Sequence, residues 1–335
     1  MNTWQYVARR LVQLVPTLFG LLILIFAIAR IMPGDPVRLA LGPEATQEQV
    51  EAFRRELGLD QPLWRQFVSY VSGLAKGDFG TSIRTFRSVG QDMKDTLAAT
   101  LELVIAALVI AVVLGIPVGI LTAIYRDSWV DNLARAVAIS GVALPRFWVG
   151  IMLQVSVAAG LGIFPIIGRD GGEVPNTVTG FYTVDALLQG DLGLFGSALR
   201  YLILPAFTLA LPTAAQLARL TRASMIEALR QQYVLVHRAY GIRRSRIAWH
   251  FALRNSLTSV LTLLGLTFGA LIENAVLVEV VFSWPGISAY GAAAVLAKDF
   301  NAVVGVTLVI GVAFLLANLI VDLLYGVLDP RVRYG

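Results

Sequence analysis

Cysteine is absent from this chain of 335 residues, and histidine occurs only twice, as His237 and His250. The first absence excludes disulfides and cysteine-based metal sites. Charged residues are also scarce, at 15% of the sequence, whereas soluble domains carry about 25%. Hydrophobic residues make up 57%, and the mean hydropathy is +0.72. A chain of this length cannot bury so much apolar surface in water, so we expect part of it to lie in a lipid bilayer.

Several functional motifs are missing as well. The sequence contains no G-x-x-x-x-G-K-[ST] phosphate loop, which excludes ATP binding through that motif, and neither H-E-x-x-H nor G-x-S-x-G occurs. Acidic residues within apolar runs are few, namely Glu102, Glu273, Glu279 and Asp322, and only Glu273 is expected deep in a span. Ion-coupled pumps need ionisable groups at mid-membrane, so this scarcity disfavours an ion-coupled transporter or channel without excluding it. A membrane scaffold or sensor without a transport path is a further alternative.

Six apolar runs of about 20 residues or more predict membrane-spanning helices. The third run is too long for one straight span, so part of it is expected to tilt or to leave the bilayer. The first run is longer than the apolar region of a cleaved signal peptide, which predicts a retained helix. Prolines in or near the runs are expected to kink them: Pro117, Pro145, Pro205 and Pro212. The runs cover residues 11–32, 97–125, 133–164, 199–220, 257–282 and 302–328.

Basic residues set the expected orientation, because cytoplasmic segments of membrane proteins carry an excess of Lys and Arg. Arginines gather near the N-terminus, between the second and third runs, in residues 222–254 and near the C-terminus. The short segments on the other side are richer in acids. The segment 33–96 contains basic residues too, but long loops cross membranes largely regardless of charge. We therefore expect both termini in the cytoplasm.

The external segment, residues 33–96, separates the first span from a transmembrane core at 97–335. Thr46 and Gln49 form a capping-box pattern, and Gly58 provides a helix stop. Asp60 is expected to cap a second helix whose apolar face holds Leu63, Phe67, Val71 and Leu74. The segment therefore predicts a small helical platform, which either packs on the protein's own spans or docks an external partner.

The most distinctive polar stretch is residues 227–254, with the sequence EALRQQYVLVHRAYGIRRSRIAWHFALR. It is rich in Arg and contains no acid after Glu227, so we expect it on the cytoplasmic side. Its pattern predicts short helices broken at Gly241, where glycine allows a sharp turn. A structured polar segment between two spans indicates a contact with another molecule.

This stretch resembles the EAA loop of ABC importer permeases, in the version found in the binding-protein-dependent dipeptide, oligopeptide and nickel permease family. The resemblance rests on residues 224–229, 233–234, 237–241 and 252–255. Other pieces resemble the same family in the same order, at residues 32–36, 57–63, 77–80, 100–103, 115–119, 279–287 and 318–333. The long external segment is typical of the first of the family's two permease subunits.

The resemblance implies an all-α, polytopic membrane protein of the bacterial or archaeal inner membrane. It implies six transmembrane helices in the type I ABC importer permease fold, with a cytoplasmic coupling helix in the loop at 223–255. The chain would form half of a translocation path for peptides or a similar small solute. It would not be an enzyme, because ATP and Mg²⁺ would bind to partner ATPase subunits, and it would bind no cofactor, metal or nucleic acid itself.

The partners implied are a second homologous permease, two cytoplasmic ATPases, an external solute-binding protein and the lipid bilayer. Relatives take dipeptides, oligopeptides, nickel complexes, glutathione or oligosaccharides. The residues expected to couple to the ATPase are Glu227, Ala228, Tyr233, His237, Arg238, Ala239, Tyr240 and Gly241.

Four residues depart from the family pattern. His237 and Tyr240 stand where Ala and Lys are common, Ser259 where Pro is frequent, and Glu273 where small residues are usual. His237 is interpreted either as a pH sensor or as a neutral packing contact. Glu227 either pairs with a nearby Arg or touches the ATPase. Glu273 either lines the translocation path or makes an interhelical hydrogen bond.

Overall fold

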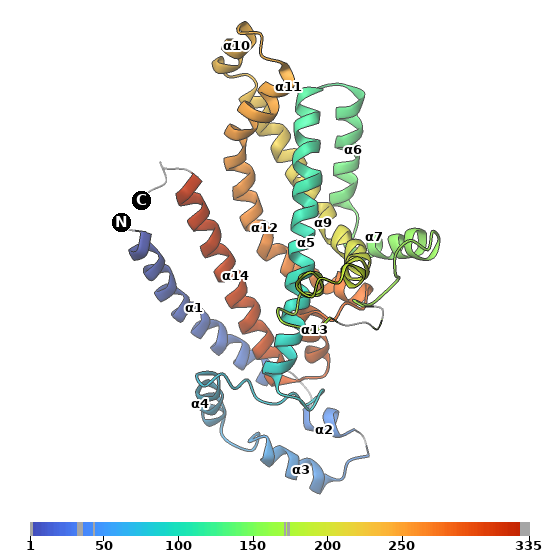
Figure 1. Ribbon diagram of the computed structural model, residues 1–335. Helices are drawn as coiled ribbons and strands as arrows, with labels where there is room; N and C mark the ends of the chain where they lie inside the picture. The colour runs from blue at the N-terminus through green and yellow to red at the C-terminus, as the bar shows by residue number, and fades with distance from the viewer. Residues whose placement is uncertain (1–2, 32–35, 43, 171, 173–174, 329–335) are drawn as a thin grey trace. The chain divides into compact units, whose positions relative to one another are not determined.

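A computed structural model describes residues 3–31, 36–42, 44–170, 172 and 175–328. These residues form helices and loops without an extended strand, apart from an isolated bridge between Thr81 and Ser88. Residues 32–35 and 329–333, which carry part of the family resemblance, lie outside the described residues, as do the side chains of Ser259 and Asp322. The chain forms two compact units (Figure 1). Among the described residues, the core unit comprises those of 101–284 and 316–328, and the N-terminal unit those of 3–100 and 285–315.

Six helical regions correspond to the six predicted spans. Four helices of the described chain are long and apolar enough to cross a membrane, and a bent pair makes a fifth candidate. The first helix contributes a shorter apolar stretch, Val15–Ile28. The regions are α1 (Thr3–Ile31), α5 (Val89–Ile124), the pair α6 (Trp129–Ala143) and α7 (Arg146–Leu153) with the π-helix η1 (Gln154–Ala159), α9 (Leu192–Ala228), α12 (Leu253–Val281) and α14 (Phe300–Leu328).

The third region, whose length predicted that part of it tilts or leaves the bilayer and whose Pro145 predicted a kink, is broken, and the chain bends there by 107°. The break falls at Leu144, which adopts an extended conformation with ψ 135° immediately before Pro145. Proline excludes the helical conformation from the residue that precedes it, so the chain turns there. The other three prolines behave differently, because Pro117, Pro205 and Pro212 lie inside helices that continue past them.

In the core unit, α9 is the central helix, with contacts to α6, α7, α12 and the short α8 (Tyr182–Leu188). Helix α5 approaches α9 closely at two glycines one turn apart. A Cβ atom on Gly115 would lie 2.7 Å from the Ala214 carbonyl oxygen, and one on Gly119 would lie 2.5 Å from Thr221 Cβ. Small residues four apart allow helix backbones to pack this closely in membranes.

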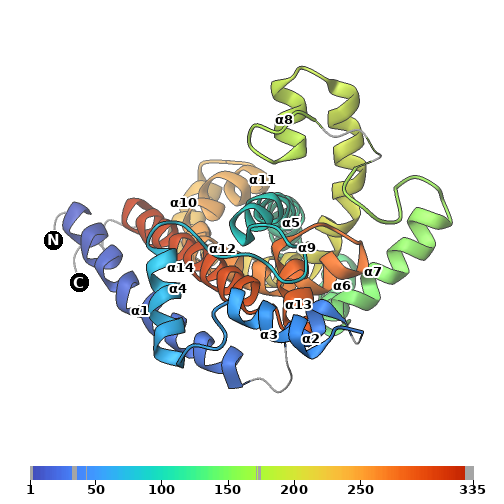
Figure 2. The same cartoon turned by 90° about the horizontal axis from the view of Figure 1, so that it is seen from below.

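The N-terminal unit contains α2 (Pro36–Leu41), α3 (Gln47–Glu56), α4 (Leu63–Leu74) and α13 (Ile287–Leu296); α2 and α3 lie side by side (Figure 2). The capping box of α3 is present, with Thr46 and Gln49 exchanging both bonds, and Gly58 follows the helix with φ +65°. The predicted cap of α4 at Asp60 is wrong, because the helix begins only after Pro62. Gln61 precedes that proline and is therefore disfavoured from helical geometry.

The apolar face of α4 packs within its own unit. Phe67, Tyr70, Val71 and Leu74 contact a cluster formed by Leu22 and Ile25 of α1 and Val304 of α14. Leu63, expected on the same face, is 59% exposed. The packing interpretation therefore describes most of this face of the external segment.

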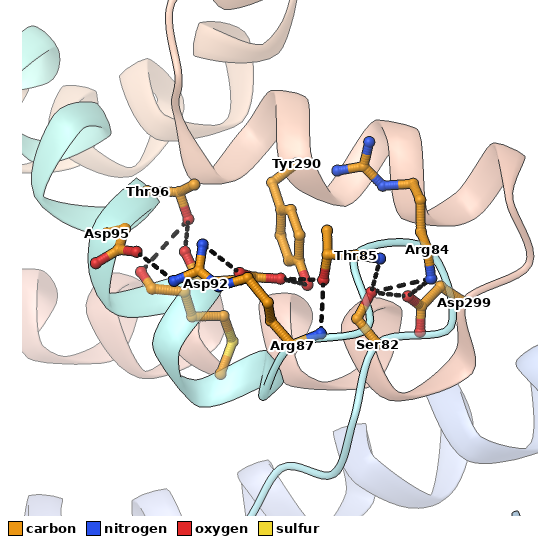
Figure 3. Close-up of polar contacts among 10 residues, drawn as sticks. Ser82, Arg84, Thr85, Arg87, Asp92, Asp95, Thr96, Tyr290 and Asp299 are labelled. Atoms are coloured by element: carbon orange, nitrogen blue, oxygen red, sulfur yellow. Dashed lines mark hydrogen bonds and ion pairs between the residues drawn. The ribbon is translucent and has the colours of Figure 1, made fainter.

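A loop at residues 80–88 is held by buried polar contacts in the N-terminal unit (Figure 3). The Ser82 hydroxyl donates to Asp299, and Thr85 Oγ1 donates to Asp92 Oδ2 at 2.5 Å. Tyr290 also donates to Asp92, at 3.2 Å. Because Ser82, Asp92 and Asp299 are almost fully buried, these bonds fix the loop against α5 and the start of α14.

Candidate functional site

The predicted coupling segment follows the end of α9 as α10 (Gln232–Ala239), α11 (Arg244–Arg246) and the π-helix η2 (Ile247–Ala252), all at one end of α12 (Figure 1). Gly241 has φ +73°. The Gly241 amide donates to the Arg238 carbonyl at 2.9 Å, and the Ile242 amide donates to the His237 carbonyl at 3.0 Å. These two bonds form a Schellman motif, which requires a left-handed residue directly after the helix. Glycine adopts this geometry without strain, so Gly241 sets the turn.

One face of α10 is anchored on the rest of the segment. Val234 is buried, and the half-buried His237 ring packs against Phe251 of η2 in a tilted arrangement, with 4.1 Å between ring centroids. His237 Nδ1 lies 2.6 Å from the Tyr233 carbonyl oxygen, and the Tyr233 ring meets His237 edge-on. These contacts give His237 a packing position, and they hold α10 in a fixed orientation.

The other face of α10 is exposed. Leu235, Val236 and Tyr240 are 63%, 54% and 81% exposed, and Arg238 and Ala239 are exposed beside them. A shallow hollow lies next to this face, lined by Arg238, Gly241, Ile242 and Arg244. Apolar and aromatic side chains presented together with Arg are typical of the centre of a protein–protein interface.

Two of the predicted coupling residues, Glu227 and Ala228, lie at the end of α9 instead of on α10. Ala228 is buried in a cluster with Ile120, Met225 and Ala252. Glu227 is exposed, and its side chain has no hydrogen bond or ion pair to any residue that the structure describes. The eight predicted residues therefore form two groups. Three are buried or half-buried and anchor the segment (Ala228, Tyr233 and His237), and five are exposed (Glu227, Arg238, Ala239, Tyr240 and Gly241).

Sequence analysis missed two polar contacts, one that joins the coupling segment to α5 and one that joins α9 to α6. Arg244 donates to the carbonyl of Ile124, the last residue of α5, at 2.5 Å. Arg222 of α9 forms a bidentate pair with the fully buried Asp131 of α6, with both N···O distances 2.7 Å. Bidentate arginine–carboxylate pairs fix orientation as well as distance, so α9 is tied to α6, while Arg244 ties the coupling segment to α5.

A second polar cluster lies at mid-span between α7 and α12. Arg146, the first residue of α7, donates from Nη1 to Asn274 Oδ1 of α12. Glu273 precedes Asn274 and is exposed. Charged residues at this depth are costly and mark functional sites by default. The structure thus brings Glu273 close to a basic residue that sequence analysis did not single out.

Comparison with known proteins accounts for nearly the whole chain. Residues 115–334 match the family described as binding-protein-dependent transport system inner membrane component, and residues 3–104 match the N-terminal membrane component of the same systems. This chain belongs to the binding-protein-dependent transport permease family. It is therefore a membrane-spanning permease component of a transport system.

Relatives are similar to the permease along its full length. The probable D,D-dipeptide transport system permease DdpB of Escherichia coli K12 is 44% identical and covers 100% of the chain and 99% of its own length. A dipeptide transport system permease, DppB, of Alkalihalophilus pseudofirmus is 38% identical, with 98% and 99% covered. The glutathione transport system permease GsiC of E. coli K12 is 36% identical, with 98% and 99% covered.

A solved structure supports the fold. The MetNI methionine ABC transporter in an inward-facing conformation contains a chain that matches at a TM-score of 0.52 with 16% identity. The match covers 69% of the permease and 93% of the MetNI chain. The predicted type I ABC importer permease fold is thereby confirmed.

At the other end of its core unit, the permease holds a loop with a buried ion pair. Arg169 Nη2 lies 2.6 Å from Glu102 Oε2, and both side chains are almost fully buried. The Arg169 guanidinium also covers the Tyr182 ring at 3.8 Å, and the Thr183 amide donates to Glu102 at 2.8 Å. Glu102, expected only as an acid near a span end, therefore anchors the segment that leads to α8.

Asp185 of α8 organises the same loop. Its carboxylate accepts the amides of Val178, Thr179 and Gly180 at 2.9–3.2 Å and the Thr179 hydroxyl at 2.8 Å. Burial opposes ionisation of Asp185, but the hydrogen bonds from Thr179, Gly180 and Val178 outweigh it and hold the pKa of the carboxyl below its usual value. None of the described residues forms a group of three or more His, Asp and Glu side chains that could hold a metal ion.

Proposed function

We propose that this permease forms half of the translocation path of an ATP-driven importer of peptides. A second homologous permease supplies the other half, and an external solute-binding protein delivers the peptide. Two cytoplasmic ATPase subunits bind ATP and Mg²⁺ and drive the cycle. The permease lies in the inner membrane of a bacterial or archaeal cell, with both termini in the cytoplasm.

The observation that carries this proposal is the coupling segment, in which an anchored helix exposes Leu235, Val236 and Tyr240 to a partner. In the proposed cycle, α10 sits in a groove of an ATPase subunit and moves with it. Arg244 passes this movement to α5, and the Arg222–Asp131 pair keeps α6 and α9 together. The transmembrane helices then alternate between inward and outward access.

The proposed substrate class is peptides, because the similar permeases are named for D,D-dipeptide, dipeptide and glutathione transport. All three are short peptide-like solutes with charged ends. The rival interpretation, an ion-coupled transporter, receives less support, since Glu273 is the single acid expected at mid-span.

Replacing Gly241 tests the coupling proposal. A Cβ atom at this position would meet nothing within 4 Å, so Gly241→Val introduces backbone strain without a clash. The strain of a left-handed β-branched residue is about 1–2 kcal/mol, enough to lower the equilibrium constant for the correctly oriented α10 by about tenfold. We expect ATP hydrolysis stimulated by the loaded binding protein, and peptide uptake into proteoliposomes, to fall by a similar factor.

Two matched variants control this experiment. Gly241→Asn should retain most activity, because asparagine tolerates the left-handed conformation. Gly196→Val changes a helical glycine that also has no atom within 4 Å and no positive φ, and it should leave both activities unchanged. Normal assembly, ATP hydrolysis and uptake in Gly241→Val would refute the assignment of the coupling segment.

A further inference from the structure

Glu273 lies at the centre of a span. It is the eleventh residue of the 19-residue apolar segment Leu263–Val281 of α12. A carboxylate at this depth that faced lipid would be strongly unfavourable, and acids in spans instead face the protein interior or a water-filled cavity. Its surroundings therefore indicate where the path runs.

Glu273 belongs to an exposed stripe of α12. The stripe follows the helical spacing of three and four residues, and its exposed members are Leu266, Ala270, Glu273, Leu277 and Val280. Because a stripe facing lipid would place Glu273 in hydrocarbon, we infer that it faces the path between the two permease subunits.

Arg146 brings a positive charge to the same place. The break at Pro145 places Arg146 at the start of α7, where one guanidinium nitrogen donates to Asn274. Its Nε atom is buried and has no hydrogen-bond partner in the structure as described. Asn274 follows Glu273 directly in the chain, so Arg146 lies near Glu273, yet no N···O distance within 4.0 Å joins these two described residues.

This arrangement differs from the other paired charges of the core unit. Arg222 with Asp131 and Arg169 with Glu102 form direct contacts at 2.7 and 2.6 Å and so neutralise each other. Arg146 and Glu273 remain close but separate, with hydrogen-bonding capacity unused on both. A purely structural pair at mid-span would gain from closing, whereas a site for a charged ligand must stay open.

We propose that Arg146 and Glu273 form a peptide-binding site in the translocation path, in which Arg146 binds the terminal carboxylate and Glu273 the terminal ammonium of a zwitterionic peptide. The site rests on the proposed function and identifies how that substrate class is recognised. The planar guanidinium suits a carboxylate, and Asn274 orients it. Glu273 supplies acceptors for the three N–H groups of an ammonium.

The test measures peptide binding to the complete transporter complex in nanodiscs, with ATP and vanadate and without the binding protein. Radiolabelled Ala-Ala is displaced by unlabelled Ala-Ala, by N-acetyl-Ala-Ala or by Ala-Ala amide. For binding to the wild-type complex, each blocked peptide should compete with labelled Ala-Ala about 10- to 100-fold less well than unlabelled Ala-Ala does. This is the range expected for the loss of hydrogen bonds to charged groups. Glu273→Gln should abolish the discrimination against the acetylated peptide only, and Arg146→Gln the discrimination against the amide only.

A structural pair would give a different result. If each variant lowered the affinity for all three peptides by the same factor, the site would be refuted. Such a result would mean that neither residue binds one particular charged end of the peptide. Glu56→Gln, a change of an exposed acid on α3, is the matched control and should preserve both discriminations. Import of Ala-Ala by a wild-type complex that shows no saturable binding would also refute the site alone. A complex that imports no peptide would overturn the proposed function together with the site.

Discussion

The coupling segment and the loop at residues 80–88 are both polar and rich in arginine, but they use their polar groups in opposite ways. In the loop, the hydroxyls of Ser82 and Thr85 donate hydrogen bonds to the buried carboxylates of Asp299 and Asp92, respectively (Figure 3). In the coupling segment, Arg238 and Tyr240 project from an anchored helix with no side-chain hydrogen bond among the described residues. Polar groups satisfied within the chain fix its structure, and those left exposed on a rigid helix are available to a partner.

The largest effect on stability is expected at the contact beneath the coupling segment. Asp131→Asn leaves the Arg222 guanidinium without its bidentate partner. Removing one member of a buried pair typically costs 3–5 kcal/mol, and Arg222 is 21% exposed, so we expect about 3 kcal/mol. The midpoint of thermal unfolding in detergent measures this loss.

Asp127→Asn is the matched control for that change. Asp127 pairs with Arg126 at 3.1 Å, but both side chains are largely exposed, so we expect at most about 0.5 kcal/mol. Equal losses of stability in the two variants would contradict the expectation that the buried Arg222–Asp131 pair contributes more than the exposed Arg126–Asp127 pair.

An intermediate effect is expected when the 80–88 loop loses a carboxylate. Asp299→Ala removes the acceptor of the Ser82 hydroxyl and the N-cap of α14, where Asp299 accepts the Ala302 amide at 3.2 Å. We expect the loop to open more easily by about 2 kcal/mol, roughly a 30-fold larger open population. Trypsin cleavage after Arg84 and Arg87, followed by mass spectrometry, reports this opening.

The control for the loop is Asp95→Ala, because Asp95 is 63% exposed and pairs with Arg87, which is itself 54% exposed. Cleavage at both sites should then stay close to the wild-type rate. Unchanged cleavage in Asp299→Ala would contradict the view that buried carboxylates hold the loop closed.

The smallest effect concerns Asp185 and depends on pH. Its hydrogen bonds lower the pKa of the folded carboxyl, so their contribution is fully present above the unfolded value of about 3.9 and is lost as pH falls through the folded pKa. Asp185→Asn should cost about 1 kcal/mol from pH 7 down to about 5, and the difference from wild type should shrink at lower pH. Unfolding midpoints of both proteins across this range provide the measurement. The exposed Asp60→Asn should show no such trend, and a constant difference down to pH 2 for Asp185→Asn would contradict the assignment.

Local signals in the sequence predicted local structure well. The Thr46–Gln49 capping box, the helix stop at Gly58 and the turn at Gly241 all occur, because each depends on residues a few positions apart. Pro145 was predicted to kink the third apolar run, and the bend falls directly before it. The predicted cap at Asp60 was wrong because α4 begins only after Pro62, which is also a local signal in the sequence.

These local sequence patterns could not predict contacts between residues that are distant in the chain. Arg169 and Glu102 are 67 positions apart, and Arg222 and Asp131 are 91 apart. In the sequence, each of these four residues is an isolated charge near the end of a span. The ion pairs form only when the folded chain brings the partners together. The short helix α13 and the two π-helices were also missed, since apolar periodicity alone does not mark them.

Helix α9 has a consequence beyond its packing. It runs unbroken for 37 residues, from the cap at Asp191 to Ala228, and passes through two prolines without ending. At 1.5 Å per residue it is roughly 55 Å long, so a rotation of about 10° displaces one tip against the other by roughly 10 Å. A helix of this length turns a modest angular change at one end into a movement at the other end as large as a dipeptide.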